Sequence, residues 1–170
     1  MVHGAESHDD AVRKLGELIK DIRVAMLTTA MPDGMLRSRP MAAQSQKFDG
    51  TLWFFCDAES AKVYEVRQDQ HVNVSFADPG QERYVSISGL ASVVRDREKA
   101  RELWTLFHKA YFPNGPDDPN LVLLKVEVDR AEYWDAPSRT MTHIIGLAKA
   151  LMTGHRYVPG DNEKLDFATH

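Results

Sequence analysis

The chain has 170 residues, of which 43% are apolar, enough for one ordinary globular domain with its own core. Its net charge of -4 and pI of about 6.0 argue against a nucleic-acid-binding protein and give no attraction to anionic membranes. The single cysteine, Cys56, excludes an intramolecular disulfide, and no Cys/His cluster has the spacing of a zinc site.

The N-terminus, MVHGAESHDD, lacks the apolar core of a signal peptide. No apolar run approaches the roughly 18 residues that a membrane-spanning helix needs. We therefore expect a cytoplasmic protein without a membrane partner.

The first predicted element is an amphipathic helix over residues 8–21. Ser7, followed by Asp10, resembles a helix-capping signal. Apolar residues then recur at helical spacing: Val12, Leu15, Leu18, Ile19 and Ile22. This pattern predicts one helix before the first strand.

Three extended segments follow, over residues 23–30, 35–46 and 51–57. The sequence Pro32-Asp33-Gly34 separates the first two, and Asp49-Gly50 separates the last two. Both are turn signals, so the pattern predicts a β-meander.

Ser60 is placed to cap a short helix over residues 61–69. Residues 71–77 and 83–94 then alternate apolar and polar side chains, which is typical of half-buried strands. Gly89 interrupts the second of these strands and marks a bulge or bend.

Asp96 is placed to cap a further helix, whose apolar face would consist of Ala100, Leu103, Trp104 and Phe107. The segment FPNGPDDPN breaks this helix, and residues 121–135 form the last predicted strand. MTHIIGLAKALMTG then reads as a helix that Gly154 stops, so residues 139–170 are expected to form a C-terminal helix and tail.

About six strands thus arrive as hairpins interrupted by short helices, without the regular βαβ alternation of a parallel sheet. We expect one mainly β (α+β) domain over residues 1–170. Its antiparallel barrel would span residues 23–135 and contain two inserted helices, with further helices at its ends.

Two segments carry side chains suited to binding an anion. In LRSRPMAAQ, Arg37 and Arg39 share one face of the strand, and arginine makes bidentate contacts to phosphate. Ser60 and Lys62 lie at a helix start, where the helix dipole disfavours a lysine unless an anion binds nearby.

Spacing alone leaves a simpler interpretation open for both segments. The two arginines would form a solvated stripe paired with surface carboxylates, and Asp57 or Glu59 would neutralise Lys62. Trp134, at the end of the last strand, would either pack in the core or stack on a planar ligand.

The sequence contains no HExxH, GxSxG, P-loop or GxGxxG motif. It supplies no evident general base or nucleophile, so any reaction would be carried by a cofactor. Cys56 is predicted to be a small buried hydrophobe rather than a reactive thiol.

Several segments occur in the order found in one known family, over about residues 10–168: RSRPMAAQ, LWFFCDAESAKV, NVSFADP, YVSISGLASVV, AEYWD and ALMTGHRYVPGDNEKLDF. Together they resemble the pyridoxamine-phosphate-oxidase-like flavin-binding split barrels, and within them the general stress protein 26 group. The resemblance implies a six-stranded antiparallel split β-barrel with flanking helices. It also implies a homodimer with FMN between the two subunits.

The resemblance assigns the contacts to the flavin phosphate residue by residue. Arg39 matches the strand arginine that holds the phosphate, and Ser60 with Lys62 matches the contacts after the third strand. Arg37 has no such match and is expected at the solvent or the dimer rim.

The contacts to the isoalloxazine ring follow in the same way. Met41, Ala42, Phe55 and Cys56 would line the ring through backbone and side-chain atoms. Tyr84 falls where the partner subunit of the oxidase offers a glutamine. Trp134 matches the tryptophan that closes over the flavin.

Two departures from the family pattern matter. Gln44 stands where the oxidase has a lysine for the substrate phosphate, and SRTMTHIIGLAKALMTG replaces an Arg-x-His-Asp-Arg signature. Pyridoxamine 5'-phosphate oxidase activity is therefore not expected. Because one flavin-contacting arginine is lost, FAD or a deazaflavin stays open as an alternative to FMN.

Two functions remain open. The chain would be a flavin-dependent oxidoreductase with a small-molecule redox partner, or a non-catalytic stress protein that stores, buffers or senses reduced flavin. A structural dimer with an empty pocket would leave Arg39 and Lys62 unexplained.

Overall fold

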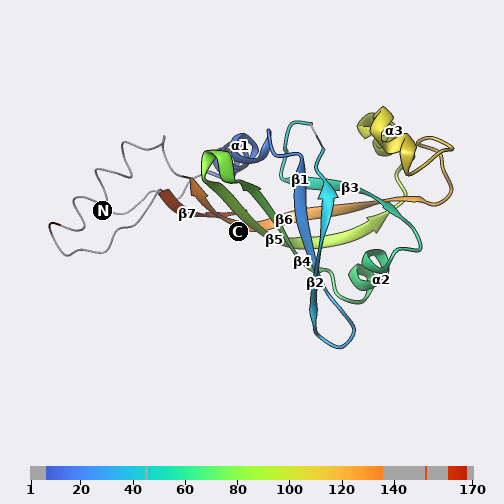
Figure 1. Cartoon of the computed structure of the whole chain (residues 1–170), viewed down its shortest axis with the longest axis horizontal. Coiled ribbons are helices and arrows are strands. Elements are labelled where there is room, and N and C mark those ends of the chain that lie inside the picture. Colours follow the sequence, from blue (N-terminus) through green and yellow to red (C-terminus); the bar gives the residue numbers. More distant parts are fainter. Residues whose placement is uncertain (1–6, 45, 136–151, 153–160, 168–170) are drawn as a thin grey trace.

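The computed structural model describes residues 7–44, 46–135, 152 and 161–167 of the chain (Figure 1). Its helices and strands follow in this order: α1 (His8–Ile19), β1 (Val24–Ala30), β2 (Leu36–Ala42), β3 (Thr51–Asp57), α2 (Ala61–Gln68), β4 (His71–Asp78), η1 (Pro79–Gln81), β5 (Arg83–Val94), α3 (Arg97–Leu103), η2 (Leu106–Ala110), β6 (Leu121–Asp135) and β7 (Asp161–Asp166). The predicted mainly antiparallel α+β fold is confirmed. Among the helices of the described residues, none is long and apolar enough to cross a membrane.

The strands form one antiparallel sheet in the order β2-β1-β4-β5-β6-β3, with β7 also paired to β6. One edge of β6 carries two partners, because β3 pairs with its first half and β7 with its second half. Figure 1 shows the β1–β2 hairpin crossing the long β5–β6 pair, so the sheet curls around a core. Within the described sheet, β2 and β3 end the hydrogen-bonded path without pairing to each other, which leaves the barrel split between them.

The predicted β-meander is wrong at its third strand, because β3 pairs with β6 rather than with β2. β3 pairs with β6 because side chains on both faces of β3 pack against other residues. Phe54 is buried in the main core and Phe55 packs on a second cluster, so the strand needs a partner that is itself covered on both sides. The first four residues of β6, Leu121–Leu124, are all buried and meet that need.

The described residues contain seven strands rather than about six, because β7 lies in the predicted C-terminal tail. Its sequence, DNEKLD, has little strand character. The free edge of β6 supplies the hydrogen-bonding partners, and Leu165 and Phe167 anchor the segment in the core. The helix predicted within residues 139–154 lies outside the described residues apart from Met152.

The predicted helix after Asp96 is shorter than its apolar pattern suggests. It ends at Leu103, and a separate turn, η2, begins after Thr105. The backbone N–H of Thr105 donates to Nδ1 of His108 at 3.0 Å, which caps η2 and breaks the helical path. Phe107 is therefore exposed instead of lying on the buried face.

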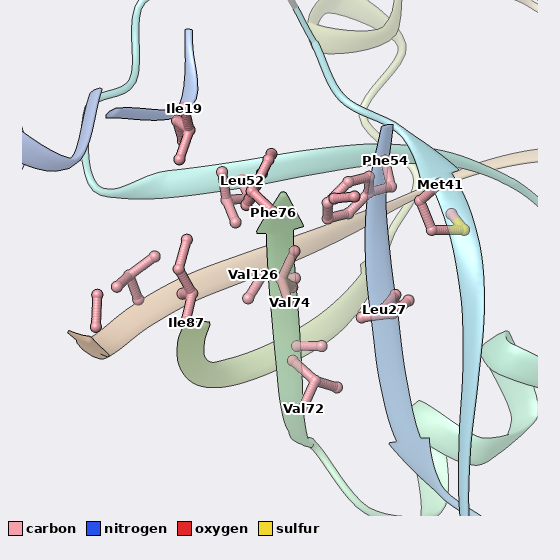
Figure 2. Packing of buried hydrophobic residues seen from close by; sticks show 14 of the residues in the cluster. Ile19, Leu27, Met41, Leu52, Phe54, Val72, Val74, Phe76, Ile87 and Val126 are labelled. Atoms are coloured by element: carbon pink, nitrogen blue, oxygen red, sulfur yellow. The ribbon is translucent and has the colours of Figure 1, made fainter. Parts of the chain in front are cut away.

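The main core fills the inside of the curled sheet. Figure 2 shows Leu27, Met41 and Phe54 pointing into the space between the β1–β2 hairpin and β3. The bulge predicted at Gly89 is confirmed by a register shift between Ser88 and Gly89. A Cβ at this glycine would collide with the backbone oxygen of Glu127, so the close strand approach requires glycine.

Candidate functional site

A buried network joins α2 to strands β1 and β2. Arg39 donates through Nη2 to Oε2 of Glu65 and through Nη1 to Oγ1 of Thr29, both at 2.6 Å. The Thr29 hydroxyl donates to the same Glu65 oxygen, also at 2.6 Å. Arg37 pairs with the other oxygen, Oε1, at 3.2 Å. We call these four residues, Thr29, Arg37, Arg39 and Glu65, the Glu65 network.

The local structure explains why these side chains meet. Residues two apart on a strand share a face, so Arg37 and Arg39 both lie on the face of β2 that meets α2. Their environments differ, since the side chain of Arg39 is 16% exposed and that of Arg37 is 45% exposed. Arg39 is therefore half-buried beneath the helix, whereas Arg37 is partly exposed to solvent beside it.

Glu65 was not predicted, because an acidic residue in a short helix normally faces solvent. The side chain is buried, and burial by itself raises its pKa. The hydrogen bonds from Thr29 and Arg39 and the charges of both arginines outweigh burial and hold the pKa below its ordinary value. Glu65 is consequently ionised at neutral pH and leaves one positive charge uncompensated in the network.

Lys62 lies three residues before Glu65 on the same side of α2 and is half-buried. The simpler interpretation, in which Asp57 or Glu59 neutralises it, is not observed within the described chain. Asp57 instead accepts from the backbone N–H of Glu59 at 2.8 Å, and its carbonyl accepts from the Ser60 hydroxyl at 2.7 Å. Lys62 therefore adds a second positive charge beside the network.

Cys56 lies between these cations and the core. It is 2% exposed, and burial raises the pKa of its thiol to about 12, although the nearby charges of Lys62 and Arg39 act in the opposite direction. The predicted burial of Cys56 is confirmed. Met41, two residues beyond Arg39 on the same face, is also buried, and Ala42 ends the strand half-buried.

Phe55 does not point toward this group of residues. Its ring stacks on His108, with the ring centroids 4.0 Å apart, and the neighbouring Cys56 faces the opposite side of β3. Burial lowers the pKa of His108, so the stack contains a neutral imidazole at neutral pH. Near the cations, Phe55 therefore offers backbone atoms rather than its ring.

Tyr84 and Trp134 are partners in the β5–β6 register and are 43% and 39% exposed. Arg39 lies in a register row with buried residues, including Leu27 and Ile87, on the inner face of the sheet. Side chains alternate between faces, so Tyr84 and Trp134 lie on the outer face. Within one chain, the aromatic pair and Arg39 are on opposite sides of the sheet.

The same outer face carries further exposed apolar residues, with the polar residues Ser75, Ser86 and Glu132 between them. Val24 is 55% exposed and Met26 is 39% exposed on β1, and Pro40 lies opposite Met26 on β2. We call the exposed residues Val24, Met26, Pro40, Tyr84 and Trp134 the outer apolar face.

A cavity of about 650 Å³ lies between α1 and the segment that connects β2 to β3. Residues from both regions and from β3 and β4 line it, among them Gln44, Phe48, Leu52, Trp53, Phe54 and Phe76. The amide of Gln44 donates to the carbonyl of Ala42 at 3.3 Å, so its position is tied to the end of β2. The described residues contain no group of three or more His, Cys, Asp or Glu that could hold a metal ion.

Comparisons with known proteins agree with the fold. Residues 10–158 match the family model described as pyridoxamine 5'-phosphate oxidase like. Protein bli-3 of Neurospora crassa is 28% identical over 156 residues, which cover 86% of this chain and 75% of that protein.

Two crystal structures extend the comparison. That of a general stress protein 26 from Jannaschia sp. CCS1 has a TM-score of 0.75 at 24% identity, with 94% and 99% of the two chains covered, and shows the common fold. That of the general stress FMN/FAD binding protein of Xanthomonas citri has a TM-score of 0.67 at 29% identity, with 78% and 94% covered. The resemblance predicted from the sequence is thus confirmed. This chain belongs to the pyridoxamine 5'-phosphate oxidase-like family.

Proposed function

We propose that this chain binds a flavin through its phosphate, at Arg39, Ser60 and Lys62, and that the flavin is FMN. The observation that carries this proposal is the charge beneath and beside α2. Two cations, Arg37 and Arg39, pair with one buried carboxylate, Glu65, and leave one positive charge, to which Lys62 on the same helix adds a second. A phosphomonoester such as that of FMN carries close to two negative charges at neutral pH.

The start of α2 adds to this site. Ser60 is the N-cap, and its hydroxyl does not cap the helix amides but donates to Asp57. A helix N-terminus with cations on two sides favours a compact dianion. In FAD the corresponding phosphate is linked on both sides and carries a single charge, so FMN matches the site better.

A second copy of the chain would complete the flavin site. Tyr84 and Trp134 lie on the face of the sheet opposite to Arg39, so they could contact the same flavin only if another subunit supplied them. The outer apolar face offers the surface for such a contact. A two-fold dimer would use this face on both subunits and contain two equivalent sites.

The bound flavin would supply hydride or electron transfer, which no side chain can provide. Arg39 and Lys62 would hold its phosphate, and the backbone at Met41 and Ala42 would support its ring. Near the cations, the thiol of Cys56 has a pKa of about 12, and Glu65 is tied up in ion pairs. Neither is suited to proton transfer at neutral pH, which favours a non-catalytic role in storing, buffering or sensing reduced flavin.

A flavin-dependent oxidoreductase is the second candidate, and the cavity beside Gln44 favours it. Its volume of about 650 Å³ suits a small molecule, and it begins where β2 ends, next to Ala42. We do not propose pyridoxamine 5'-phosphate oxidase activity. The neutral amide of Gln44 cannot replace a lysine as a partner for a substrate phosphate.

The test is the spectrum and ligand content of the purified chain. A yellow protein that releases FMN on denaturation supports the proposal, whereas a colourless protein that does not quench the fluorescence of added FMN refutes it. Bleaching of the bound flavin by NADH or NADPH at a catalytic rate would favour the oxidoreductase. No reduction over minutes would favour the non-catalytic role.

A further inference from the structure

Glu65 connects the two parts of the proposed phosphate site. It is 3% exposed, lies on α2 with Lys62, and contacts Thr29 on β1 and Arg39 on β2. Each of its oxygens has a cationic partner, since Arg37 pairs with Oε1 and Arg39 with Oε2. This carboxylate therefore ties Arg39 on β2 to the helix that carries Lys62.

Arg39 keeps most of its donors available despite these contacts. A guanidinium has five N–H donors in a planar fork, and two of them donate to Thr29 and Glu65. The two bonds fix the plane of the fork, so the remaining donors have set directions. An arginine ordered during folding loses no further rotamer freedom when its ligand binds.

We propose that Glu65 is a positioning residue for the flavin phosphate. It holds Arg39 in the orientation that binds the phosphate and ties that arginine to the helix carrying Ser60 and Lys62. This inference rests on the proposed flavin binding and deepens it, because it adds a residue that does not itself touch the phosphate.

The direction in which Glu65→Gln changes the affinity for FMN distinguishes a positioning role from a purely electrostatic one. Glu65→Gln removes a negative charge close to the phosphate, so Coulomb attraction alone predicts tighter binding of FMN. It also replaces an acceptor oxygen with an amide NH₂ group, which faces an arginine donor and frees one guanidinium to move. Positioning therefore predicts weaker binding.

The experiment measures the dissociation constants of FMN and riboflavin for the full chain by fluorescence quenching. Riboflavin lacks the phosphate and reports on the rest of the site. In Glu65→Gln we expect FMN affinity to fall by about tenfold to a hundredfold and riboflavin affinity to change by less than about twofold. A merely structural role would weaken both flavins together.

Glu59→Gln is the matched control. Glu59 is exposed, directly precedes Ser60 and makes none of the contacts of the Glu65 network. Removing its charge is expected to leave FMN affinity unchanged or slightly higher. Unchanged or tighter FMN binding in Glu65→Gln, or an equal loss for both flavins, would overturn the inference.

Thr29 provides a second test if Glu65→Gln does not fold. Thr29→Ser keeps the hydroxyl that links Arg39 to Glu65, whereas Thr29→Val removes it at similar volume. We expect Thr29→Val to bind FMN about tenfold more weakly than Thr29→Ser, with equal riboflavin affinity. Equal FMN affinity in the two variants would refute positioning. Failure of the unmodified chain to bind FMN would instead refute the proposed function itself.

Discussion

The two sides of the curled sheet differ in how complete they are within one chain. On the inner side, the side chains of the Glu65 network pair with one another, and α2 closes the network. On the outer side, Tyr84 and Trp134 expose large aromatic surfaces among other apolar residues. The inner region carries paired side chains with excess positive charge, whereas the outer region leaves large apolar side chains exposed within one chain.

This difference separates recognition of a phosphate from recognition of a ring. One subunit can arrange the charges and hydrogen bonds for a phosphate, because the side chains of the Glu65 network pair with one another before a ligand binds. An aromatic side chain that covers a planar ligand must lie on the same side of the sheet as that ligand. Within one chain, Tyr84 and Trp134 lie on the face opposite to Arg39, so they cannot cover a ligand bound there. Substitutions on the inner face and on the outer face test the two sides of the sheet separately.

The largest effect is expected from reversing a charge on the inner side. Lys62→Glu should weaken FMN binding by about 3 kcal/mol, because it replaces a charge-assisted contact with repulsion. Titration of FMN and riboflavin measures the change, and only FMN should be affected. Arg39→Glu should act in the same direction, but it also places a second carboxylate beside Glu65. Normal FMN affinity in both variants would refute the phosphate assignment.

The next effect concerns the stability that Glu65 contributes to the fold. Glu65→Gln should lower the free energy of unfolding at pH 7 by about 2 kcal/mol, since it leaves a donor of the half-buried Arg39 without its charged acceptor. The folded-state pKa of Glu65 is depressed, so its stabilisation is present above the ordinary value of 4.5 and is lost as the pH falls through the lower folded value. Urea unfolding at pH 7 and near pH 3 measures this. A difference between wild type and variant that does not shrink in acid would contradict it.

A smaller effect is expected on the outer side. Met26→Glu places a charge in the outer apolar face and should weaken the proposed dimer by about 1–2 kcal/mol. Sedimentation measures the monomer fraction, and FMN affinity should fall with it because the aromatic pair is then missing. Met35→Glu is the matched control, since Met35 is also exposed but lies at the β1–β2 turn. Similar behaviour of the two variants would argue against this face as the interface.

The smallest effect is a predicted lack of reaction at Cys56. With its thiol pKa raised to about 12 by burial, the side chain stays protonated at pH 8. Iodoacetamide should not modify the folded chain over an hour but should modify it rapidly in urea, as mass spectrometry can show. Fast alkylation of the folded protein would mean that the Cys56 thiol is accessible to solvent, which would contradict its burial.

Much of the secondary structure could be predicted, because its signals are local. The turn signal before residues 51–57 and the alternation in residues 83–94 placed β3 and β5 correctly, and Ser60 marked the start of α2. The partner of β3 could not be predicted in the same way. Strand pairing depends on which apolar side chains must be buried, and the segments that bury them lie far apart in the sequence.

The candidate site shows the same division. The pattern of Arg39, Ser60 and Lys62 was visible because each type of residue suits an anion by itself. Glu65 was missed because its role exists only when α2 packs on β1 and β2. The one signal available was Thr29, a polar residue at an inward position of β1, next to which a buried partner was to be expected.

The sequence by itself determined the class of fold, the family and the cations suited to a phosphate, because these depend on periodicity and side-chain chemistry along short segments. Only the tertiary structure decided that Phe55 turns away toward His108, that Tyr84 and Trp134 face outward, and that Glu65 is buried between two arginines. The physical reason is that burial and facing are properties of the packed sheet. A side chain acquires them only when distant segments come together.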